Sequence, residues 1–522
     1  MKRFWVNLLL SLTSGILMSL AAPPLNWWWL AWVALVPFWL VISPKSEGSG
    51  KQTWLWVLVW GVSYHGITLS WILGLHPLTW MGVPWLASVA IALFCWGFIT
   101  LWGTLANWVW AWVVGKIAPP GHFTPQAQIR FRLKRVWIGT ALWCGLEFGL
   151  NLTPLSWTSL SFTQSPGNLV ILHLGRLSGP LLVTATIVAF NGLLAEAWLH
   201  TQQNRTNSRL TLPLVAIAGL LLVVTHAIGW HFYNQPLNDV PEQALSVGVI
   251  QGNIPTREKL SGNGIRRAVQ NYVGGYEALV EQGAEAVLTP EGSLPFLWDK
   301  VHNPFRAAVL EKKVPAWLGI FVADAGNITQ SLLSLDTTGE VVGRYNKIKL
   351  VPLGEYIPFQ NTLGQLIGRL SPIKSSMVPG TTEQHFDTPF GRAIASICYE
   401  SVFPELFRQQ ATTGGQLILT ASNLDPYSEM LMVQHQAHDL MRGIETDRWS
   451  ARATNTGYSG FINPHGKIIW RSQPRTYQLH SETIYRRQTQ TMYVRWGDWA
   501  TPILLGSAAV VWIYHRIRNL HP

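Results

Sequence analysis

The stretch "FGRAIASICYESVFPELF" (Phe390–Phe407) runs from an expected strand into an expected helix, with a cysteine between them. Its apolar part, "AIASIC", is typical of a buried strand, and "VFPELF" begins a helix soon afterwards. Cys398 ends the strand, and Tyr399 and Glu400 follow at once. A side chain on such a tight turn is exposed on one side, and the backbone N–H groups beside it can point at a developing oxyanion.

Cysteine is rare in this chain. It occurs three times in 522 residues, and Cys398 is alone between about residue 240 and residue 488, so this region has no disulfide framework. Cys95 and Cys144 lie in long apolar runs, where a thiol is most simply a small hydrophobe. From this stretch alone, Cys398 is either a nucleophile or a buried structural cysteine.

Short apolar runs alternate with helical stretches throughout the region around Cys398. The predicted strands cover residues 244–253, 284–292, 315–324, 328–336, 340–350, 392–398 and 416–423. The predicted helices cover residues 265–282, 403–411 and 429–449. Strands that alternate with helices indicate an α/β domain.

Two charged residues stand where predicted strands end. Glu291 closes the run in "VLTPEGSLP", and Lys347 closes the run in "RYNKIKLVPLGEYIPF", with Glu355 eight residues further on. Each charge alone is explained as a solvated strand end. Together with Cys398 they supply a base, a cation and a thiol at strand ends, where ligands of α/β folds usually bind.

The rest of the chain has the composition of a membrane protein. Charged residues make up 12% of it, against about 25% in a soluble domain, and its 29 tryptophans suit membrane interfaces. Eight apolar runs are near the length of roughly 17–25 residues that crosses a bilayer: 4–22, 25–43, 53–74, 85–114, 136–151, 180–199, 211–231 and 497–515. The net charge of +11 does not indicate nucleic acid, because the positive residues lie at the ends of apolar runs.

The distribution of Lys and Arg predicts the orientation. These residues precede the first run, follow the last and fill alternate loops, whereas residues 22–26 and 75–84 contain none. The positive-inside rule then places both termini in the cytoplasm. We therefore predict a seven-span domain over residues 1–231, an external domain over 232–496, and a C-terminal transmembrane helix with a cytoplasmic tail over 497–522. Arg176 and Arg495 break the pattern, and either contact anionic headgroups or are simply tolerated.

The N-terminus, "MKRFWVNLLLSLTSGILMSLAAPP", also has the features of a signal peptide. Pro23 and Pro24 follow the Ala-Ala site directly and argue against cleavage. We expect a retained helix.

The motifs "TPEGSLP", "YNKIKLVPLGEY" and "ICYES", in that order, resemble the Glu–Lys–Cys triad of the nitrilase superfamily. Together with the predicted spans, they make the whole chain similar to the apolipoprotein N-acyltransferase family of membrane enzymes. The motifs around Lys347 and Cys398 are specific, whereas the membrane part matches only in the number, placement and topology of its spans. The resemblance implies an external nitrilase-like domain built as an αββα sandwich.

The resemblance also implies a role for each site residue. Glu291 is the expected general base for the Cys398 thiol, and Lys347 is expected to stabilise the oxyanion with the backbone N–H of Tyr399. Glu355 is expected to support the lysine or the substrate. Glu400 is expected to hold the turn through hydrogen bonds.

The implied reaction is acyl transfer between two lipid-anchored substrates. Cys398 is expected to take an acyl chain from a membrane phospholipid as a thioester and to pass it to the α-amino group of an apolipoprotein's N-terminal diacylglyceryl-cysteine. We expect a multi-pass protein of the bacterial inner membrane, with its catalytic domain on the periplasmic side, acting as a monomer. No metal cluster or nucleotide-binding loop is recognisable in the sequence, so we predict no cofactor, no metal and no nucleic-acid partner.

The chain departs from the family pattern at positions expected to shape the substrate pockets. Many members have tryptophan at the positions of Leu260 and Thr289, and an Asn-Asp-x-Trp-Phe loop where this chain has "SNLDPYSEM" (Ser422–Met430). The departures concern substrate preference more than reaction type. Leu363–Gly380 is either an interfacial lid or an ordinary surface loop. Arg442, Glu445 and Arg448 resemble charged residues of the family's following helix, and for them we favour structural salt bridges.

Two other functions fit parts of the sequence. A membrane-tethered nitrilase-type amidase would use the same triad with water as the acceptor, although eight spans are excessive for a tether. A transporter with an external sensory domain would place ionisable residues inside its spans. Glu147 and Glu196 lie near span ends, His65 is the main interior candidate, and no inverted repeat is visible.

Overall fold

The computed structural model describes residues 2–43, 49–117, 125–203, 211–324, 326–356, 377–425 and 427–520. The chain divides into two compact units. The helical unit contains residues 1–70, 93–235 and 496–522, and the sheet unit contains residues 71–92 and 236–495.

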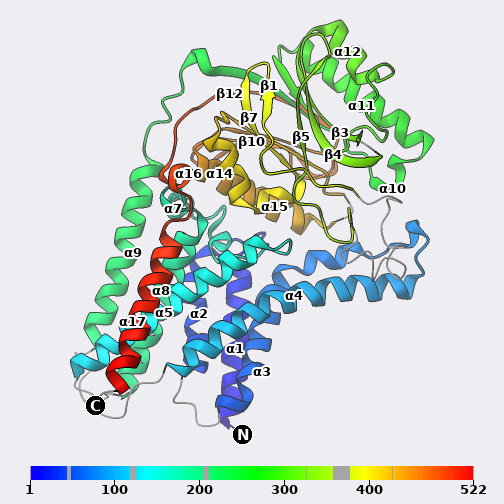
Figure 1. Ribbon diagram of the computed structural model, residues 1–522. Coiled ribbons are helices and arrows are strands. Elements are labelled where there is room, and N and C mark those ends of the chain that lie inside the picture. Colours follow the sequence, from blue (N-terminus) through cyan, green and yellow to red (C-terminus); the bar gives the residue numbers. More distant parts are fainter. Residues whose placement is uncertain are drawn as a thin grey trace. The chain divides into compact units, whose positions relative to one another are not determined.

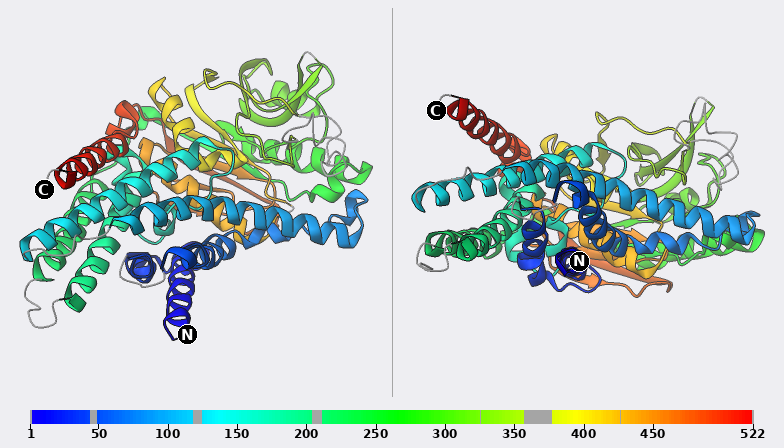
Figure 2. Two further views of the ribbon diagram at one scale, coloured as in Figure 1. Left: turned by 60° about the horizontal axis from the view of Figure 1, so that its bottom comes forward. Right: turned by 90° about the horizontal axis from the view of Figure 1, so that it is seen from below.

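The helical unit has a helix at each of the eight predicted apolar runs. The main helices are α1 (Lys2–Ala21), α2 (Ala31–Val41), α3 (Ser49–Gly61), α4 (Trp85–Lys116), α5 (Pro125–Leu152), α8 (Pro180–Gln203), α9 (Leu212–Tyr233) and α17 (Ala500–Leu520), with the first residues of α4 belonging to the sheet unit. Two short helices that the sequence did not predict, α6 (Leu169–Leu172) and α7 (Gly175–Ser178), lie between α5 and α8. Helices α8 and α9 run side by side (Figures 1 and 2).

Four helices within the described residues are long and apolar enough to cross a membrane: 3–21, 85–116, 180–203 and 212–233. The others fall short for local reasons. Helix α2 has 11 residues, α3 has 13, and α5 carries four basic residues in its first three turns. Four candidate membrane helices are therefore established by length and composition, and the count of eight spans stays a prediction.

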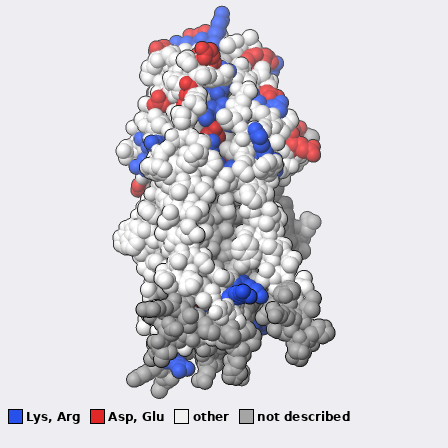
Figure 3. Space-filling view, turned by 90° about the vertical axis from the view of Figure 1, so that its left-hand side faces the viewer, with Lys and Arg blue, Asp and Glu red and all other residues white. Residues whose placement is uncertain are grey.

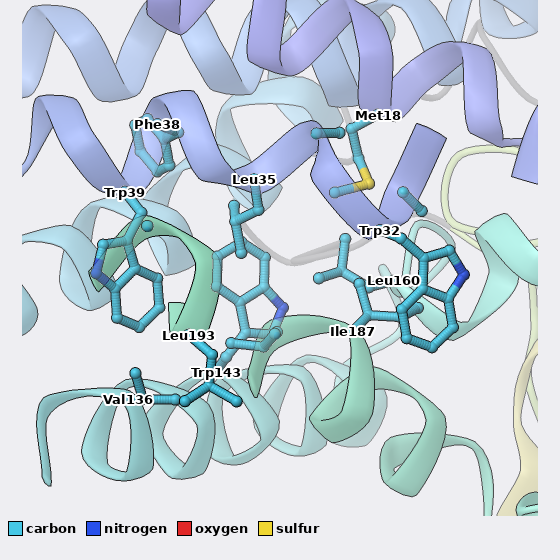
Figure 4. Packing of buried hydrophobic residues seen from close by; sticks show 14 of the residues in the cluster. Met18, Trp32, Leu35, Phe38, Trp39, Val136, Trp143, Leu160, Ile187 and Leu193 are labelled. Atoms are coloured by element: carbon cyan, nitrogen blue, oxygen red, sulfur yellow. The ribbon is translucent and has the colours of Figure 1, made fainter. Parts of the chain in front are cut away.

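Aromatic residues dominate the interior of the helical unit. Trp39 and Phe38 from α2 pack with Trp143 from α5 and with apolar residues of α1 and α8 (Figure 4). The outer faces are apolar as well. Helix α9 contains no Lys, Arg, Asp or Glu and exposes Leu, Val, Ile and Trp side chains. In Figure 3 the middle of the face on its side of the molecule is white, whereas charged side chains gather toward the top. Apolar side chains both inside and outside are typical of a protein surrounded by lipid.

One buried carboxylate links three of these helices. Glu196 of α8 accepts hydrogen bonds from Arg132 and Arg135 of α5, each at 2.6 Å, and from the indole N–H of Trp39 at 2.9 Å. The Glu196 side chain is 1% exposed. Buried charges of this kind are tolerated when they are fully paired, so the cluster has a sufficient explanation as a structural contact between α2, α5 and α8.

The described part of the sheet unit contains two six-stranded sheets. The first has the order β12 (Gln478–Tyr485), β1 (Ala244–Gln251), β2 (Ala286–Leu288), β3 (Ala316–Asp324), β4 (Asn327–Leu335) and β5 (Val341–Asn346). The second has the order β11 (Ile468–Arg471), β10 (Gly460–Ile462), β9 (Ser450–Thr454), β8 (Ile418–Ser422), β7 (Gly391–Ile397) and β6 (Phe386–Thr388). The central strands β1–β2–β3 and β7–β8–β9 are parallel, and the outer pairs are antiparallel.

The two sheets face each other and helices cover their outer sides. Strand β9 contacts β1 and β2 across the interface between the sheets. Helices α11 (Gly262–Glu281) and α12 (Pro304–Lys312) pack on the first sheet, and α14 (Pro404–Thr412) and α15 (Glu429–Thr446) on the second (Figure 1). A short helix, α10 (Thr256–Lys259), precedes α11, and α16 (Met492–Trp496) follows β12. The nitrilase-like arrangement of sheets and helices expected from the motifs is present.

Candidate active site

Cys398 lies where β7 ends. It is the first residue of a 3-10 turn, η8 (Cys398–Val402), and α14 begins only at Pro404. Its φ of +53° is in the left-handed region, which non-glycine residues seldom adopt. The cysteine is 8% exposed, and its Sγ lies 3.9 Å from the carbonyl oxygen of Asn423.

Glu291 follows β2 and is held at both carboxylate oxygens. Oε1 accepts a hydrogen bond from Lys347 Nζ at 2.8 Å, and Oε2 accepts one from the backbone N–H of Asn423 at 2.9 Å. The loop that carries Glu291 lies so close to β3 that a Cβ on Gly319 would fall 2.1 Å from the carbonyl oxygen of Pro290. A residue with a Cβ at position 319 would clash with the backbone of this loop, so glycine is required for the loop to pack this close to β3.

Lys347 follows β5, and its side chain is 1% exposed. Its ammonium donates to Glu291 at 2.8 Å and to Glu355 at 2.6 Å. Burial alone would lower the pKa of Lys347, but the two carboxylates raise it well above its usual range and so favour the charged form of the lysine. Glu355 Oε2 accepts the backbone N–H of Val351 at 2.8 Å. Burial raises the pKa of Glu355, and the Lys347 charge opposes the rise.

Glu400 connects the cysteine loop to the lysine loop. Its Oε2 accepts the N–H of Ile397 at 2.7 Å, and its Oε1 accepts the N–H groups of Ile348 at 2.6 Å and Lys349 at 3.3 Å. Burial raises the pKa of Glu400 to about 7, although the backbone hydrogen bonds favour its charged form. The ring of Tyr399, beside it, packs edge-on against Phe403, with 5.2 Å between ring centroids.

The environment keeps the Cys398 thiol protonated at rest. Burial raises its pKa far above the usual range, the charge of Glu291 raises it further, and Lys347 acts in the opposite direction. A thiol of this kind becomes a nucleophile only when a neighbouring base accepts its proton. Of the predicted residues, the structure brings Glu291, Lys347 and Glu355 into direct contact and places Cys398 within their electrostatic influence.

Sequence reasoning gave no individual role to the residue that contacts both Glu291 and Cys398, although this residue lies in the loop Ser422–Met430. Asn423 follows β8, and its backbone N–H binds Glu291 while its carbonyl faces the Cys398 sulfur. Its side-chain Oδ1 accepts a hydrogen bond from Asn455 Nδ2 at 3.0 Å, and Asn455 also donates to the carbonyl of Ile254 at 2.7 Å. Asn423 ends the run "QLILTASN", so the strand-end rule that selected Glu291 and Lys347 would also have selected it.

The positions that depart from the family pattern have different surroundings. Leu260 is 73% exposed, whereas Thr289 is fully buried and donates to Ser293. In the loop Ser422–Met430, Tyr427 lies within the electrostatic influence of Cys398 and packs edge-on against Trp71, with 5.4 Å between ring centroids. Pro426 of this loop, and residues 363–376 of the expected lid Leu363–Gly380, lie outside the described residues.

The three charged residues of α15 and the turn after it make structural contacts. Arg442 pairs with Glu445 at 2.7 Å and donates to the carbonyls of Ser401 and Val402, each at 3.3 Å. Arg442 thus binds the turn that carries Cys398. Arg448 donates to the carbonyl groups of Gly415 and Thr489.

No group of three or more His, Cys, Asp or Glu side chains that could hold a metal ion occurs within the part of the chain that the structure describes.

Comparison with known proteins agrees with this architecture. Residues 246–492 match the family described as Carbon-nitrogen hydrolase, and residues 14–193 match the Apolipoprotein N-acyltransferase N-terminal domain. The sheet unit thus defines an enzyme of the carbon–nitrogen hydrolase class, joined to a largely apolar helical domain.

Curated relatives cover nearly the whole chain. The Apolipoprotein N-acyltransferase of Nostoc sp. (strain PCC 7120) is 51% identical over 498 residues, which is 95% of this chain and 97% of the relative. The protein of the same name from Synechocystis sp. (strain PCC 6803) is 44% identical over 97% of this chain and 100% of the relative. That from Thermosynechococcus vestitus is 43% identical over 94% and 91%. The chain belongs to the apolipoprotein N-acyltransferase family.

Proposed function

We propose that this protein transfers a fatty acyl chain from a membrane phospholipid, through a thioester on Cys398, to the α-amino group of the N-terminal S-diacylglyceryl-cysteine of apolipoproteins. The contact of Lys347 with Glu291 beside the Cys398 turn carries the proposal, because it gathers a base, a cation and a thiol from three strand ends. The names of the relatives support the lipoprotein acceptor.

The first half-reaction forms the thioester. Glu291 accepts the thiol proton of Cys398, and the thiolate attacks the ester carbonyl of the phospholipid. Lys347 and the backbone N–H of Tyr399 stabilise the tetrahedral oxyanion, and one well-placed donor of this kind contributes roughly 3–4 kcal/mol. As the intermediate collapses, the C–O bond breaks, and Glu291 returns its proton to the departing oxygen of the lysophospholipid.

The second half-reaction transfers the chain to nitrogen. The neutral α-amino group of the acceptor attacks the thioester carbonyl, and Glu291 accepts a proton from the attacking nitrogen. The same donors stabilise the second oxyanion. The C–S bond then breaks, the thiolate recovers its proton from Glu291, and an amide is released. Atoms and charges balance over the two steps without a metal or cofactor.

The proposed location is the inner membrane, with eight spans and residues 232–496 on the periplasmic side. The four candidate membrane helices and the basic residues at alternate ends of the apolar runs support it. Both substrates carry lipid anchors, so a site near the outer-leaflet surface reaches both, and a monomer is sufficient.

Reporter fusions test this orientation. Alkaline phosphatase, which is active only outside the cytoplasm, is expected to be active when fused after residue 240 and inactive when fused after residue 116. The asymmetry of Lys and Arg is the physical reason. Activity in the opposite order would overturn the orientation.

Mass spectrometry of lipoprotein N-termini tests the function. In cells that lack this protein, we expect the N-terminal cysteine to carry the diacylglyceryl group and a free α-amine. Returning the gene is expected to add one acyl group, observed as the corresponding mass increase on the N-terminal peptide. Identical N-termini with and without the protein would reject the proposed acceptor.

A further inference from the structure

Lys259 is a buried cation to which the mechanism above gives no role. It is the last residue of α10 and is 7% exposed, whereas its neighbour Leu260 is 73% exposed. Burial lowers the pKa of Lys259 to about 8, and the charges of Glu291 and Asp425 oppose the fall. The lysine is therefore mainly protonated at neutral pH and lies within the electrostatic influence of the proposed base.

The ammonium of Lys259 has no hydrogen-bond acceptor among the residues that the structure describes. The two carboxylates near it are engaged elsewhere. Glu291 accepts from Lys347 at 2.8 Å and from the N–H of Asn423 at 2.9 Å, and Asp425 accepts the N–H of Thr256 at 2.6 Å. The Lys259 side chain as a whole is buried, but its Nζ is not fully enclosed and keeps contact with solvent. An anionic acceptor supplied by a ligand would take the place of that solvent.

The backbone holds Lys259 in place. The residues before α10 are fixed by Asn455, which binds both the N–H of Ile254 at 2.9 Å and its carbonyl at 2.7 Å. After α10 the chain turns tightly, since a Cβ on Gly264 would fall 1.9 Å from the carbonyl oxygen of Glu258. The same Asn455 binds Asn423, which contacts Glu291 and Cys398. The lysine is thus part of the framework that holds the base and the thiol.

We propose that Lys259 binds the phosphate anion of the phospholipid headgroup while the donor ester lies at Cys398. The inference rests on the proposed function, which brings such an ester to the site. In a glycerophospholipid the phosphodiester is separated from the acyl ester only by the glycerol carbons. Helix α10, which carries Lys259, is bound at Thr256 by Asp425, two residues beyond the Asn423 that contacts Glu291 and Cys398, so its cation is a candidate for the phosphate. The other lysine of the site, Lys347, already donates to Glu291 and Glu355. The acceptor carries no phosphate, so Lys259 acts in the first half-reaction.

Single-turnover labelling of the full-length protein in detergent tests the proposal. Two donors with identical labelled acyl chains are compared: a phosphatidylglycerol and the diacylglycerol that lacks its phosphate. Lys259→Met is expected to lower the rate with phosphatidylglycerol by about tenfold or more, the loss expected when a hydrogen bond to a charged group is removed. The same variant is expected to leave the labelling rate with diacylglycerol unchanged. Lys259→Arg keeps most of the phosphatidylglycerol rate, because it keeps the charge.

Controls separate this role from a structural one. Lys312→Met removes a partly exposed lysine that pairs with Glu281 at 2.9 Å, and it is expected to change neither rate. The aminolysis of preformed thioester is expected to be the same in Lys259→Met and wild type. Inorganic phosphate is expected to inhibit labelling from phosphatidylglycerol in wild type but not in Lys259→Met.

Two results would overturn the proposal. An equal loss with both donors would mean that Lys259 only positions Glu291. Inhibition by inorganic phosphate that persists in Lys259→Met would place the anion elsewhere. A wild-type protein labelled by neither donor would instead contradict the proposed function, and the two failures are thereby distinguished.

Discussion

Cys398→Ala is expected to abolish covalent labelling of the protein by a phospholipid with a labelled acyl chain. The wild-type label is expected to be a thioester, which neutral hydroxylamine releases. Cys398→Ser is expected to be nearly inactive, because a serine hydroxyl is far harder to deprotonate than a thiol and a carboxylate is too weak a base to compensate. Mass spectrometry of the intact protein before and after hydroxylamine measures the effect.

The other cysteines provide matched controls for this experiment. Cys95 is partly exposed on α4, and Cys144 is buried within α5. Cys95→Ala and Cys144→Ala are expected to keep the label at the wild-type level. Transfer of acyl chains by Cys398→Ala at a rate near that of wild type would show that the thioester mechanism is wrong for this protein.

Lys347→Met is expected to reduce the rate of Cys398 acylation at least about a hundredfold, since it removes a donor proposed to contribute roughly 3 kcal/mol at the oxyanion. The side chain keeps its length and loses its charge. Single-turnover labelling measures the rate. Retention of more than about a tenth of the wild-type rate would be too much for an oxyanion role of this size.

A double variant distinguishes lost catalysis from lost structure. Without the ammonium, Glu291 and Glu355 lack the cation that both now bind, and unpaired buried carboxylates destabilise a fold. Lys347→Met combined with Glu355→Gln removes one of the two charges and is expected to recover part of the thermal stability. If the double variant also recovered the acylation rate, Lys347 would have only a structural role.

The membrane part was predictable in outline because span length and apolarity are local properties of the sequence. Each predicted run coincides with helix, yet among the residues that the structure describes four helices meet the length and composition of a candidate span. Helix α5 shows why hydropathy along the sequence does not by itself identify the helices of this unit. Its Arg132 and Arg135 reduce its hydropathy, but they are buried against Glu196, which is 61 or more residues away in the chain.

The strands after residue 449 were missed for a similar reason. Strand β9 (Ser450–Thr454) has the polar sequence "SARAT" and follows a helix predicted to end at Trp449, although α15 ends at Thr446. Arg452 within β9 is fully buried because it pairs with Asp439 of α15 and donates to the carbonyl of Tyr458. Strand β9 is therefore buried because a charged residue on another element pairs with its arginine, and not because its sequence is apolar.

Some residues of the candidate site can be recognised from the sequence around them, and others cannot. Glu291, Lys347 and Cys398 each follow a recognisable apolar strand, so the strand-end rule finds them. Asn455 and Lys259 have no such signal. Asn455 contributes side-chain bonds to Ile254 and Asn423, which are 201 and 32 residues away, and such contacts exist only once the two sheets have met.

The left-handed backbone at Cys398 has an evolutionary consequence. A φ of +53° favours glycine or asparagine over a residue with a larger side chain, so cysteine is an unfavourable choice there for folding alone, by about 1 kcal/mol. The proposed role of Cys398 as the nucleophile would account for a cysteine at this position. In a lineage that no longer modified its lipoproteins, drift would be free to substitute glycine at this position. The descendant would be a more stable protein without the reaction, recognisable by the loss of one residue from an otherwise intact turn.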